Sequence, residues 1–371
     1  MRHAYLYEAV RTPIGKRDGG LASIRPDDLL ADTLAALVKR AGIDAAAVED
    51  VIAGCVTQTG EQGLNIARIA ALCAGFPVTV CGTSVNRQCG SSQQAANFAA
   101  ATVASGQADL VIAAGVESMT RVPMMSDGGT ISDRLLDRYD LVNQGIAAEI
   151  VAEKWRLTRQ EIDAFSFESH RKAVAARDSG RFDEEIVPVG SVKRDEGPRT
   201  DTSLEKLATL KSAFRDGGLI TAGNSSQISD GAAALLVGSE EAAKAFDLRP
   251  KARFVATALA GVDPTIMLTG PIPATQKVLR KAGLKISDID LVEINEAFAP
   301  VILAWLAETG ADRARVNVNG GAIALGHPLG ATGARLLTTI VHELHRRKAR
   351  YGLVTMCIGF GQATATIIER V

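Results

Sequence analysis

The sequence predicts an α/β protein built by duplication, with two similar halves and an insertion in the first. Two stretches show the repeat, LVKRAGIDAAAVEDVIAG at 37–54 and VLRKAGLKISDIDLVEIN at 278–295. Each is typical of a helix that ends in Lys/Arg and Ala-Gly, followed by a short linker and a buried strand. A chain of 371 residues is long enough for two such halves.

The later elements of the two halves also correspond. In the first half, a polar turn at Cys89 precedes a helix expected at about 90–105 and the strand ADLVIAAGV. In the second half, a glycine-rich turn at His327 precedes a helix expected at about 330–347 and the strand YGLVTMCIG. Alternating strands and helices with short connections predict mainly parallel sheets covered by helices. A site is then expected between the halves, in the turns that follow the carboxyl ends of the strands.

Between the halves the pattern changes to an inserted loop domain. It contains one expected helix at EIVAEKWRL, a second that ends at ESHRKAVAARDSG, and the charged loop VKRDEGPRTDTSLEKL. A last strand of the first half is expected at 231–239. We therefore assign residues 1–117 and 231–248 to an N-terminal half, 118–230 to the insertion, and 249–371 to a C-terminal half.

Composition limits the function. The 41 basic and 42 acidic residues give a net charge of -1, so no global field favours nucleic acid or an acidic membrane. No apolar run is long enough to span a bilayer, and no targeting segment is recognised at either end, so a cytoplasmic protein is expected. The five cysteines, an odd number, predict free thiols. No metal site is expected, because CxxC is absent and HELH at 342–345 misses the HExxH spacing.

Two residues are candidates for nucleophile and base. Cys89 precedes a helix, whose dipole should lower the thiol pKa and favour the thiolate; the alternative is a small buried hydrophobic residue. His327 stands between Gly326 and Pro328 in a constrained turn. That setting favours an imidazole presented at a cleft over a histidine of the core.

Two further candidates end buried strands. Asn295 follows LVEI and either caps a helix or fixes a water through its amide. Cys357 closes LVTMC and is followed by Gly359 and Gly361, which let a ligand approach free backbone N–H groups. A structural cysteine is the alternative for Cys357.

At these positions the chain resembles the thiolase family. CGSS around Cys89, NEAFA at 295–299, GGAIALGHPLGATGAR and the Cys-Ile-Gly of CIGFG match four family signatures in order. Supporting similarity comes from RTPIGK, GVESM and TAGNSSQISDGAAALL, and it covers essentially the whole chain. The resemblance implies two βαβαβαββ halves that form a five-layered αβαβα core, with a loop domain inserted in the first.

The resemblance also implies roles. Cys89 would accept the acyl group, with His327 assisting its deprotonation, and Cys357 would be the second acid/base. His327 and a water held by Asn295 would stabilise the thioester oxyanion or enolate. The N–H groups of Cys89 and Gly359 would form a second oxyanion hole. The implied reaction converts 3-oxoacyl-CoA and CoA into acetyl-CoA and a shortened acyl-CoA, or the reverse, without a metal or redox cofactor.

Substrate contacts are carried over by the same resemblance. CoA, a substrate and not a cofactor, would contact Ser226, Ala222 and Phe298. Arg199 and Lys206 are candidates for its phosphates, with a solvated charged surface as the alternative.

Three features depart from the family pattern. Phe360 lies where the family usually has the second of three glycines, so it should restrict or reshape the acyl pocket. Asn143, Gln144 and Gly145 stand where many short-chain members have His-Met-Gly, so a preference for acetoacetyl-CoA is not implied. Residues 120–140 are short compared with a tetramer-forming loop. A homodimer is expected, with a homotetramer and a β-oxidation partner subunit as further alternatives.

Other functions remain open at the level of sequence. A ketoacyl-synthase-like condensing enzyme shares the fold but pairs its cysteine with two histidines. A non-catalytic acyl-CoA- or lipid-binding thiolase homologue would lack the nucleophile or the base. A cysteine hydrolase would release free acid without CoA. The reactive residues at 89, 295, 327 and 357 favour the thiolase.

Overall fold

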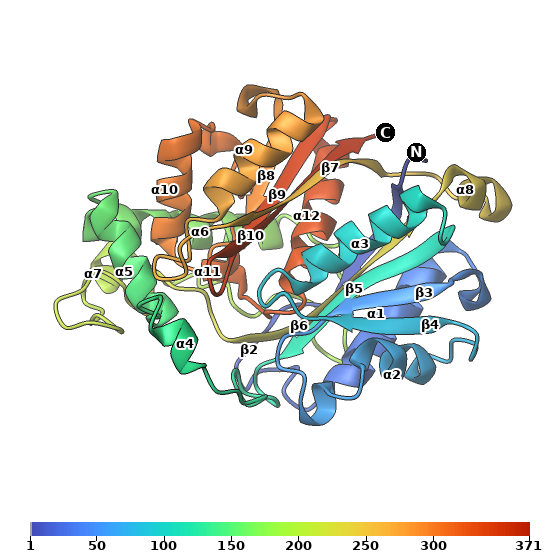
Figure 1. Ribbon diagram of the computed structural model, residues 1–371, viewed down its shortest axis with the longest axis horizontal. Helices are drawn as coiled ribbons and strands as arrows, with labels where there is room; N and C mark the ends of the chain where they lie inside the picture. The colour runs from blue at the N-terminus through green and yellow to red at the C-terminus, as the bar shows by residue number, and fades with distance from the viewer. Residues whose placement is uncertain (1) are drawn as a thin grey trace.

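The computed structural model describes residues 2–371, whose ten strands form one mixed sheet (Figure 1). The strands are β1 Tyr5–Arg11, β2 Gly15–Lys16, β3 Asp50–Gly54, β4 Cys81–Val85, β5 Leu110–Ser118, β6 Ser229–Gly238, β7 Ala252–Gly261, β8 Leu291–Ile294, β9 Tyr351–Ile358 and β10 Gln362–Arg370. The helices are α1 Pro26–Ala41, α2 Ile66–Cys73, α3 Ser91–Ser105, α4 Asp133–Leu136, α5 Gln144–Lys154, α6 Arg159–Asp178, α7 Leu204–Ala208, α8 Glu240–Phe246, α9 Pro271–Ala282, α10 Ala299–Thr309, α11 Ala322–Leu325 and α12 Thr332–Arg347.

The two halves meet in the middle of this sheet. β1 and β7 pair through Tyr5 with Arg253 and Leu6 with Ala252. Outward from β1 the first half continues as β6, β5, β3 and β4, and outward from β7 the second half continues as β10, β9 and β8. The order β1, β6, β5, β3 matches the order β7, β10, β9, β8, which confirms the duplication expected from the sequence. In residues 2–371 the second half has no strand that corresponds to β4, and only an isolated bridge between Val292 and Val316 lies beside β8.

The repeated sequence stretches fold alike. α1 ends at Gly42 with φ 70° and α9 ends at Gly283 with φ 68°, a left-handed conformation that glycine adopts without strain. A short 3-10 helix follows in each half, Ala45–Ala47 before β3 and Ile286–Asp288 before β8.

The expectation of mainly parallel sheets was wrong. Parallel pairing is limited to β3 with β4, β3 with β5 and β8 with β9. The strands between them, including β5 with β6 and β9 with β10, pair antiparallel. Residues 359–361 alone connect β9 to β10, and a parallel crossover needs about a dozen residues or more.

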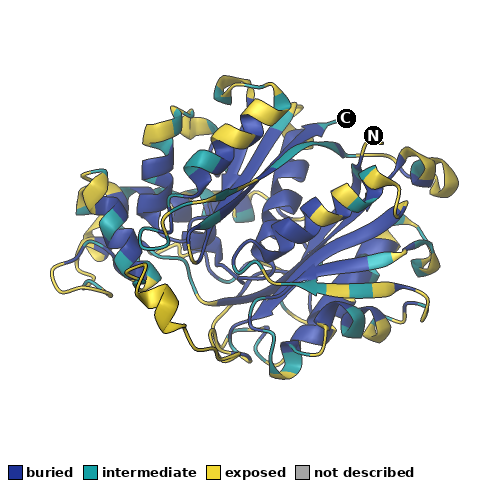
Figure 2. Cartoon of the chain, in the orientation of Figure 1, coloured by how far each residue is buried: buried dark blue, intermediate teal, exposed yellow. Residues whose placement is uncertain are grey.

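The helices and the two parts of the sheet form five layers. α3 and α12 pack on each other in the central layer, and each contacts strands of both halves. α1 and α2 cover the outer face of the first half, and α9 and α10 cover that of the second. Figure 2 shows the strands and the central helices mostly buried. This is the layered core that the resemblance implied.

The inserted segment packs on the second half. α5 and α6 contact α10, and residues of these helices share one apolar core. The helix expected at EIVAEKWRL is α5, which begins earlier, at Gln144, and ends at Lys154. The helix expected to end at ESHRKAVAARDSG is α6. The strand expected at 231–239 is β6.

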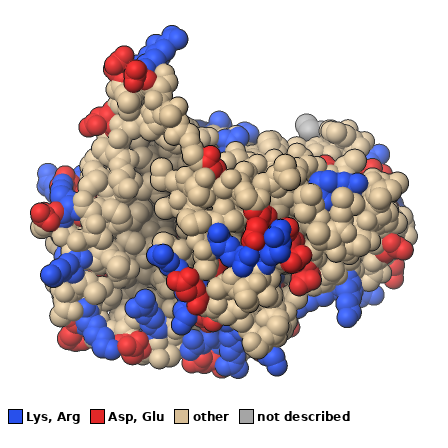
Figure 3. Space-filling model, turned by 90° about the horizontal axis from the view of Figure 1, so that it is seen from below, with Lys and Arg blue, Asp and Glu red and all other residues tan. Residues whose placement is uncertain are grey.

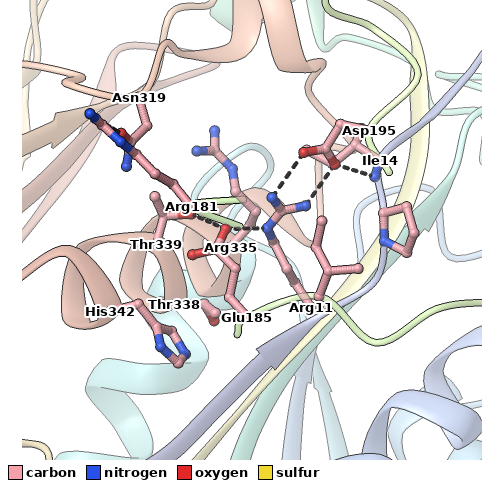
Figure 4. A network of polar contacts seen from close by, with 12 residues as sticks. Arg11, Ile14, Arg181, Glu185, Asp195, Asn319, Arg335, Thr338, Thr339 and His342 are labelled. Carbon is pink, nitrogen blue, oxygen red and sulfur yellow. Dashed lines mark hydrogen bonds and ion pairs between the residues drawn. The ribbon is translucent and has the colours of Figure 1, made fainter. Parts of the chain in front are cut away.

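Arg11 at the end of β1 fastens the insertion through buried ion pairs (Figure 4). Its Nε donates to Glu185 at 2.6 Å, and its Nη1 and Nη2 donate to Asp195 at 2.7 and 2.9 Å. Asp195 also accepts from the backbone N–H of Ile14 at 2.8 Å, and Thr339 of α12 donates to Glu185 at 3.0 Å. The arginine of RTPIGK therefore joins the insertion to β1 and α12.

The surface is mixed in charge. The face in Figure 3 carries Lys and Arg side chains beside Asp and Glu in small groups, in agreement with the net charge of -1. Among residues 2–371, no helix combines the length and apolar character that a membrane crossing requires.

Candidate active site

Cys89 lies in the turn between β4 and α3, with 7 % of its surface exposed. Gly90 is the N-cap of α3. The first turn of the helix sits directly on neighbouring strands, because a Cβ on Gly54 would lie 2.3 Å from Ser92 N, and one on Gly115 would lie 2.5 Å from Ser92 Cβ. These two glycines bring the cysteine to the carboxyl ends of β3 and β5.

The expectation of a lowered pKa for the Cys89 thiol was wrong. Burial raises the pKa of Cys89 to about 11, although the backbone N–H groups of Cys89 and Gly359 oppose this by hydrogen bonding to the sulfur. A helix N-terminus contributes about 0.3–1 kcal/mol, less than one pKa unit of about 1.4 kcal/mol. Full burial can change a pKa by about 3–5. Cys89 also precedes the N-cap, outside the first turn.

This correction predicts how the thiol reacts with pH. Iodoacetamide should alkylate Cys89 about tenfold faster for each pH unit between about 6 and 9, because only the thiolate reacts and its fraction grows tenfold per unit below the pKa. The rate is measured from the mass of the Cys89 peptide, with the exposed Cys73 as internal reference. A plateau within this range would instead indicate a preformed thiolate.

His327 lies in the turn before α12 and is 4 % exposed. Its backbone N–H donates to the carbonyl of Gln227 at 3.2 Å. Its Nδ1 is 2.6 Å from the hydroxyl oxygen of Thr332, and that hydroxyl donates to the carbonyl of Pro328 at 2.8 Å. The only hydroxyl proton is therefore used on Pro328, so we assign the ring proton to Nδ1, which donates to Thr332. Nε2 then carries the lone pair.

Nε2 of His327 faces Asn295. Burial lowers the pKa of His327 to about 3, and the charge of Arg335 adds to this, so the imidazole is neutral at pH 7. Asn295 Nδ2 lies 3.3 Å from Nε2. Asn295 Oδ1 is buried without a hydrogen-bond partner among residues 2–371, and such an atom calls for a bound water or ligand. Helix α10 begins after Phe298, so Asn295 is not a helix cap.

Cys357 lies near the end of β9 and close to Cys89. Burial raises its pKa well above the usual range, and the neighbouring Cys89 raises it further. The turn that follows reaches the residue before Cys89, because a Cβ on Gly359 would lie 1.9 Å from Gln88 Oε1 and 3.4 Å from Gln144 Nε2.

The two central helices hold the two turns together. Ser92 Oγ accepts a hydrogen bond from the backbone N–H of Ala334 at 2.9 Å. A Cβ on Gly333 would lie 2.2 Å from the backbone nitrogen of Gln93. α3 and α12 therefore begin side by side, so the turns that precede them are neighbours. These contacts link Cys89 to Cys357 and Gly359 and link His327 to Asn295, and the paired helices place both groups at the contact between the halves.

Family models match both halves of the chain. The model described as thiolase, N-terminal domain, matches residues 4–241, and the one described as thiolase, C-terminal domain, matches residues 248–370. The chain belongs to the thiolase family.

Named relatives agree. The "steroid 3-ketoacyl-CoA thiolase FadA6" of Mycobacterium tuberculosis is 51% identical over 388 residues, which cover 100% of this chain and 95% of that protein. The "3-oxoadipyl-CoA/3-oxo-5,6-dehydrosuberyl-CoA thiolase" of Escherichia coli is 47% identical over 401 residues, covering 100% of both. The crystal structure of the Bacillus anthracis acetyl-CoA acetyltransferase superposes with a TM-score of 0.93 at 41% identity, covering 100% of this chain and 99% of that one. These relatives support thiolase activity, which is an acyl transfer.

Three residues expected to contact CoA lie together in this thiolase. The backbone N–H of Ser226 donates to the carbonyl of Ala297 at 2.9 Å, so the TAGNSS segment runs along NEAFA. Phe298 packs edge-to-face on Phe214 with 5.9 Å between ring centroids. Ala222 is exposed in the same segment. The contact of these three residues with CoA stays a prediction.

The two phosphate candidates lie in the charged loop. Lys206 Nζ donates to the carboxylate of Asp201 at 2.9 Å, and Arg199 donates through its backbone N–H to Nδ1 of His170 at 3.2 Å. A Cβ on Gly223 would lie 2.6 Å from Leu207 Cδ2, which brings α7 alongside the TAGNSS turn. The contact of Arg199 and Lys206 with phosphate stays a prediction.

Sequence reasoning missed two polar residues of the site. Thr332 sets the tautomer of His327, and Gln88 contacts the Gly359 turn. Its place directly before Cys89 was a visible signal for Gln88. Thr332 could be recognised only from the structure, because the turn folds back and brings Thr332 to His327.

Proposed function

We propose that this thiolase exchanges acyl groups between 3-oxoacyl-CoA and CoA through an intermediate on Cys89. The surroundings of that thiol carry the proposal. Two backbone N–H groups, of Cys89 and Gly359, stabilise negative charge there, and a second thiol, Cys357, adjoins it. A Claisen cleavage needs one group that binds the acyl chain covalently and a second group that donates or removes the α-proton.

The first half-reaction releases acetyl-CoA. His327 Nε2 takes the thiol proton as the sulfur of Cys89 attacks the 3-oxo carbon. The resulting oxyanion accepts hydrogen bonds from the N–H groups of Cys89 and Gly359. When the C2–C3 bond breaks, its electron pair enters the acetyl-CoA enolate, and the Cys357 thiol donates its proton to C2.

The second half-reaction frees the enzyme. The Cys357 thiolate takes the proton of the CoA thiol, whose sulfur attacks the acyl carbonyl on Cys89. The shortened acyl-CoA leaves, and protonated His327 returns its proton to the Cys89 sulfur. The condensation runs the same steps backwards, with Cys357 as base toward the α-carbon of acetyl-CoA.

Asn295 would stabilise the enolate through a bound water. The thioester oxygen of the enolate gains negative charge and needs donors. A water bound to the unpartnered Oδ1 of Asn295 would turn its other proton toward that oxygen, beside His327. The imidazole is neutral at pH 7, so Nε2 carries the lone pair that a general base needs.

An acyl-labelling experiment tests the proposal. The protein is incubated separately with acetyl-CoA and acetoacetyl-CoA, quenched in acid and digested, and acetylated peptides are located by mass. We expect one acetyl group on Cys89 and transfer of that group to added CoA. No label in folded protein, or a label on another residue, would contradict the assignment.

The same experiment separates the alternatives. A non-catalytic binding homologue would bind acyl-CoA without a label. A hydrolase would release free acid when CoA is absent. The ketoacyl-synthase alternative is disfavoured because Asn295 and Cys357, and not a second histidine, accompany His327.

We further propose that the acyl group is larger than that of acetoacetyl-CoA. Two of the similar relatives are named for steroid and 3-oxoadipyl substrates. The amides of Gln88 and Gln144 lie against the Gly359 turn. Such side chains can hydrogen-bond polar groups of a longer acyl chain.

Phe360 should control chain length. It has a left-handed φ of 57° and is 48% exposed, and a glycine adopts this conformation without the cost of roughly 1–2 kcal/mol that a side chain carries. We expect Phe360→Gly to fold and to raise kcat/KM for long 3-oxoacyl-CoA relative to acetoacetyl-CoA by about tenfold, within the range for a changed apolar contact. Phe246→Ala, at a phenylalanine of α8 that is 40% exposed, should leave the ratio unchanged. An unchanged ratio in Phe360→Gly would contradict the role.

The remaining expectations are proposals as well. CoA enters as a substrate, and we propose no metal or redox cofactor; residues 2–371 include no group of three His, Cys, Asp or Glu arranged for a metal ion. We propose a cytoplasmic location, with which the free cysteines agree, and a part in fatty acid metabolism or β-oxidation, which rests on the family resemblance.

We propose a homodimer for this enzyme. β4 is an edge strand, and an open groove of about 670 Å³ beside it is lined by β4 and by exposed residues of α3 such as Phe98. A second copy would cover this edge, which otherwise offers unpaired backbone groups. A monomer in light scattering would contradict the proposal. The tetramer and a partner subunit stay predictions from the resemblance.

A further inference from the structure

Glu117 is a buried carboxylate that the reaction scheme above does not use. It lies near the end of β5, in the GVESM stretch, and its exposed fraction is 0%. A charged side chain is seldom buried in this way without specific partners.

Four N–H groups surround this carboxylate. Its Oε1 accepts from the backbone of Thr57 at 3.1 Å and from Gln62 Nε2 at 2.8 Å. Its Oε2 accepts from the backbone of Val56 at 3.0 Å and of Gly330 at 2.8 Å. Burial raises the pKa of Glu117, against the pull of these bonds. The geometry fits the ionised form, because each oxygen accepts from two N–H groups. A protonated oxygen would direct its own O–H toward one of these donors.

The donors belong to both halves of the molecule. Val56, Thr57 and Gln62 follow β3 in the first half, whereas Gly330 lies in the second half, three residues after His327. The contact at Gly330 is tight, because a Cβ there would lie 2.5 Å from the carbonyl of Val116 and 2.7 Å from Glu117 Oε2. Glu117 therefore ties the turn of His327 to the strand on which the turn of Cys89 rests.

We propose that Glu117 is a positioning residue that sets His327 against Cys89. The inference rests on the proposed roles of these two residues, and Glu117 itself touches neither the acyl group nor CoA. Its charge has a cost, because it disfavours the Cys89 thiolate. Removing the charge should therefore favour the thiolate and also loosen the turn of His327. The alkylation rate of Cys89 should then rise while kcat for thiolysis falls.

Glu117→Gln tests this. The amide keeps the shape but turns an NH2 group toward two donors, so two of the four hydrogen bonds are lost. We expect kcat for thiolysis to fall about 100-fold, as for a misplaced catalytic group, with KM for CoA changed by less than about threefold. Alkylation of Cys89 by iodoacetamide at fixed pH should become at least about twofold faster. General damage to the fold would also expose Cys89 and speed its alkylation. The circular dichroism spectrum and thermal unfolding of the variant must therefore match those of the wild type.

Two further variants complete the test. Glu117→Asp keeps the charge but is one methylene too short to reach both sides, so kcat should fall without faster alkylation. Glu343→Gln, at a buried carboxylate in the last turns of α12, should change neither property. If Glu117→Gln does not fold, Glu117→Asp still decides the positioning role.

The outcomes also separate this inference from the proposed function. Wild-type kcat in Glu117→Gln, or turnover and alkylation lowered together, would overturn the positioning role alone. Wild-type protein that forms no acyl group on Cys89 would overturn the proposed function itself.

Discussion

Cys89→Ser should lower the rate of acyl transfer by at least about 10³-fold and leave the protein folded. A hydroxyl is a far weaker acid than a thiol, so the neutral His327 cannot deprotonate it to a useful extent. The small change in volume at this buried site should be tolerated. The measurement is label transfer from acetyl-CoA to residue 89 and thiolysis of a 3-oxoacyl-CoA, with circular dichroism to show folding.

A matched substitution guards against a general effect of losing a cysteine. Cys73→Ser changes an exposed thiol at the end of α2 and should keep wild-type turnover. Equal acylation of wild type and Cys89→Ser would remove Cys89 as the nucleophile. Loss of activity in both variants would show that the assay responds to something other than the proposed intermediate.

Many helix and strand ends of the fold could be predicted because they depend on local sequence patterns. The Ala-Gly pairs after α1 and α9 predicted helix ends, and the structure has Gly42 and Gly283 in the left-handed conformation there. Strand patterns followed by Asn295 and Cys357 placed both residues at strand ends, where β8 and β9 pair side by side. The duplication could be recognised for the same reason.

The direction of the strands and the acidity of the thiol depend on contacts that are distant in the sequence. The three residues between β9 and β10 are too few for a parallel crossover. The prediction of mainly parallel sheets was based instead on the alternation of strands and helices along the chain. Cys89 was expected to respond to its own helix, whereas Leu329 and Ile358 of the second half belong to the same buried core. Burial by a distant part of the chain cannot be inferred from the residues next to the cysteine.

Buried polar contacts were the least accessible part of the site. The tautomer of His327 depends on a hydroxyl that has already donated its proton elsewhere. The role of Glu117 depends on four donors from two halves. GVESM could be matched to a family pattern, but no local rule connects its glutamate to the turn after His327.

Cys357→Ala should separate the two chemical roles of the site. We expect the variant to accept an acetyl group on Cys89 from acetyl-CoA but to lose exchange of the α-protons of acetyl-CoA by about 100-fold or more, the scale of a lost general acid/base. Burial raises the pKa of the Cys357 thiol well above its usual range. The thiol is therefore protonated and ready to donate to an enolate, and its thiolate is a strong base toward carbon. Exchange is followed by mass in D2O, and acylation by the Cys89 peptide.

Cys55→Ala provides the control, because Cys55 is also a buried thiol whose pKa burial raises, at the end of β3. It should keep both acylation and proton exchange. Continued exchange in Cys357→Ala would mean that another group removes the α-proton, and His327 would be the first to test. Acylation should be slower than in the wild type, because Cys357 also gives a proton to the departing CoA sulfur when the second half-reaction runs in reverse. Complete loss of acylation would mean that Cys357 also shapes the nucleophile site, since the two sulfurs are neighbours. Retained acylation with lost exchange fits a division in which Cys89 carries the acyl group and Cys357 carries the proton.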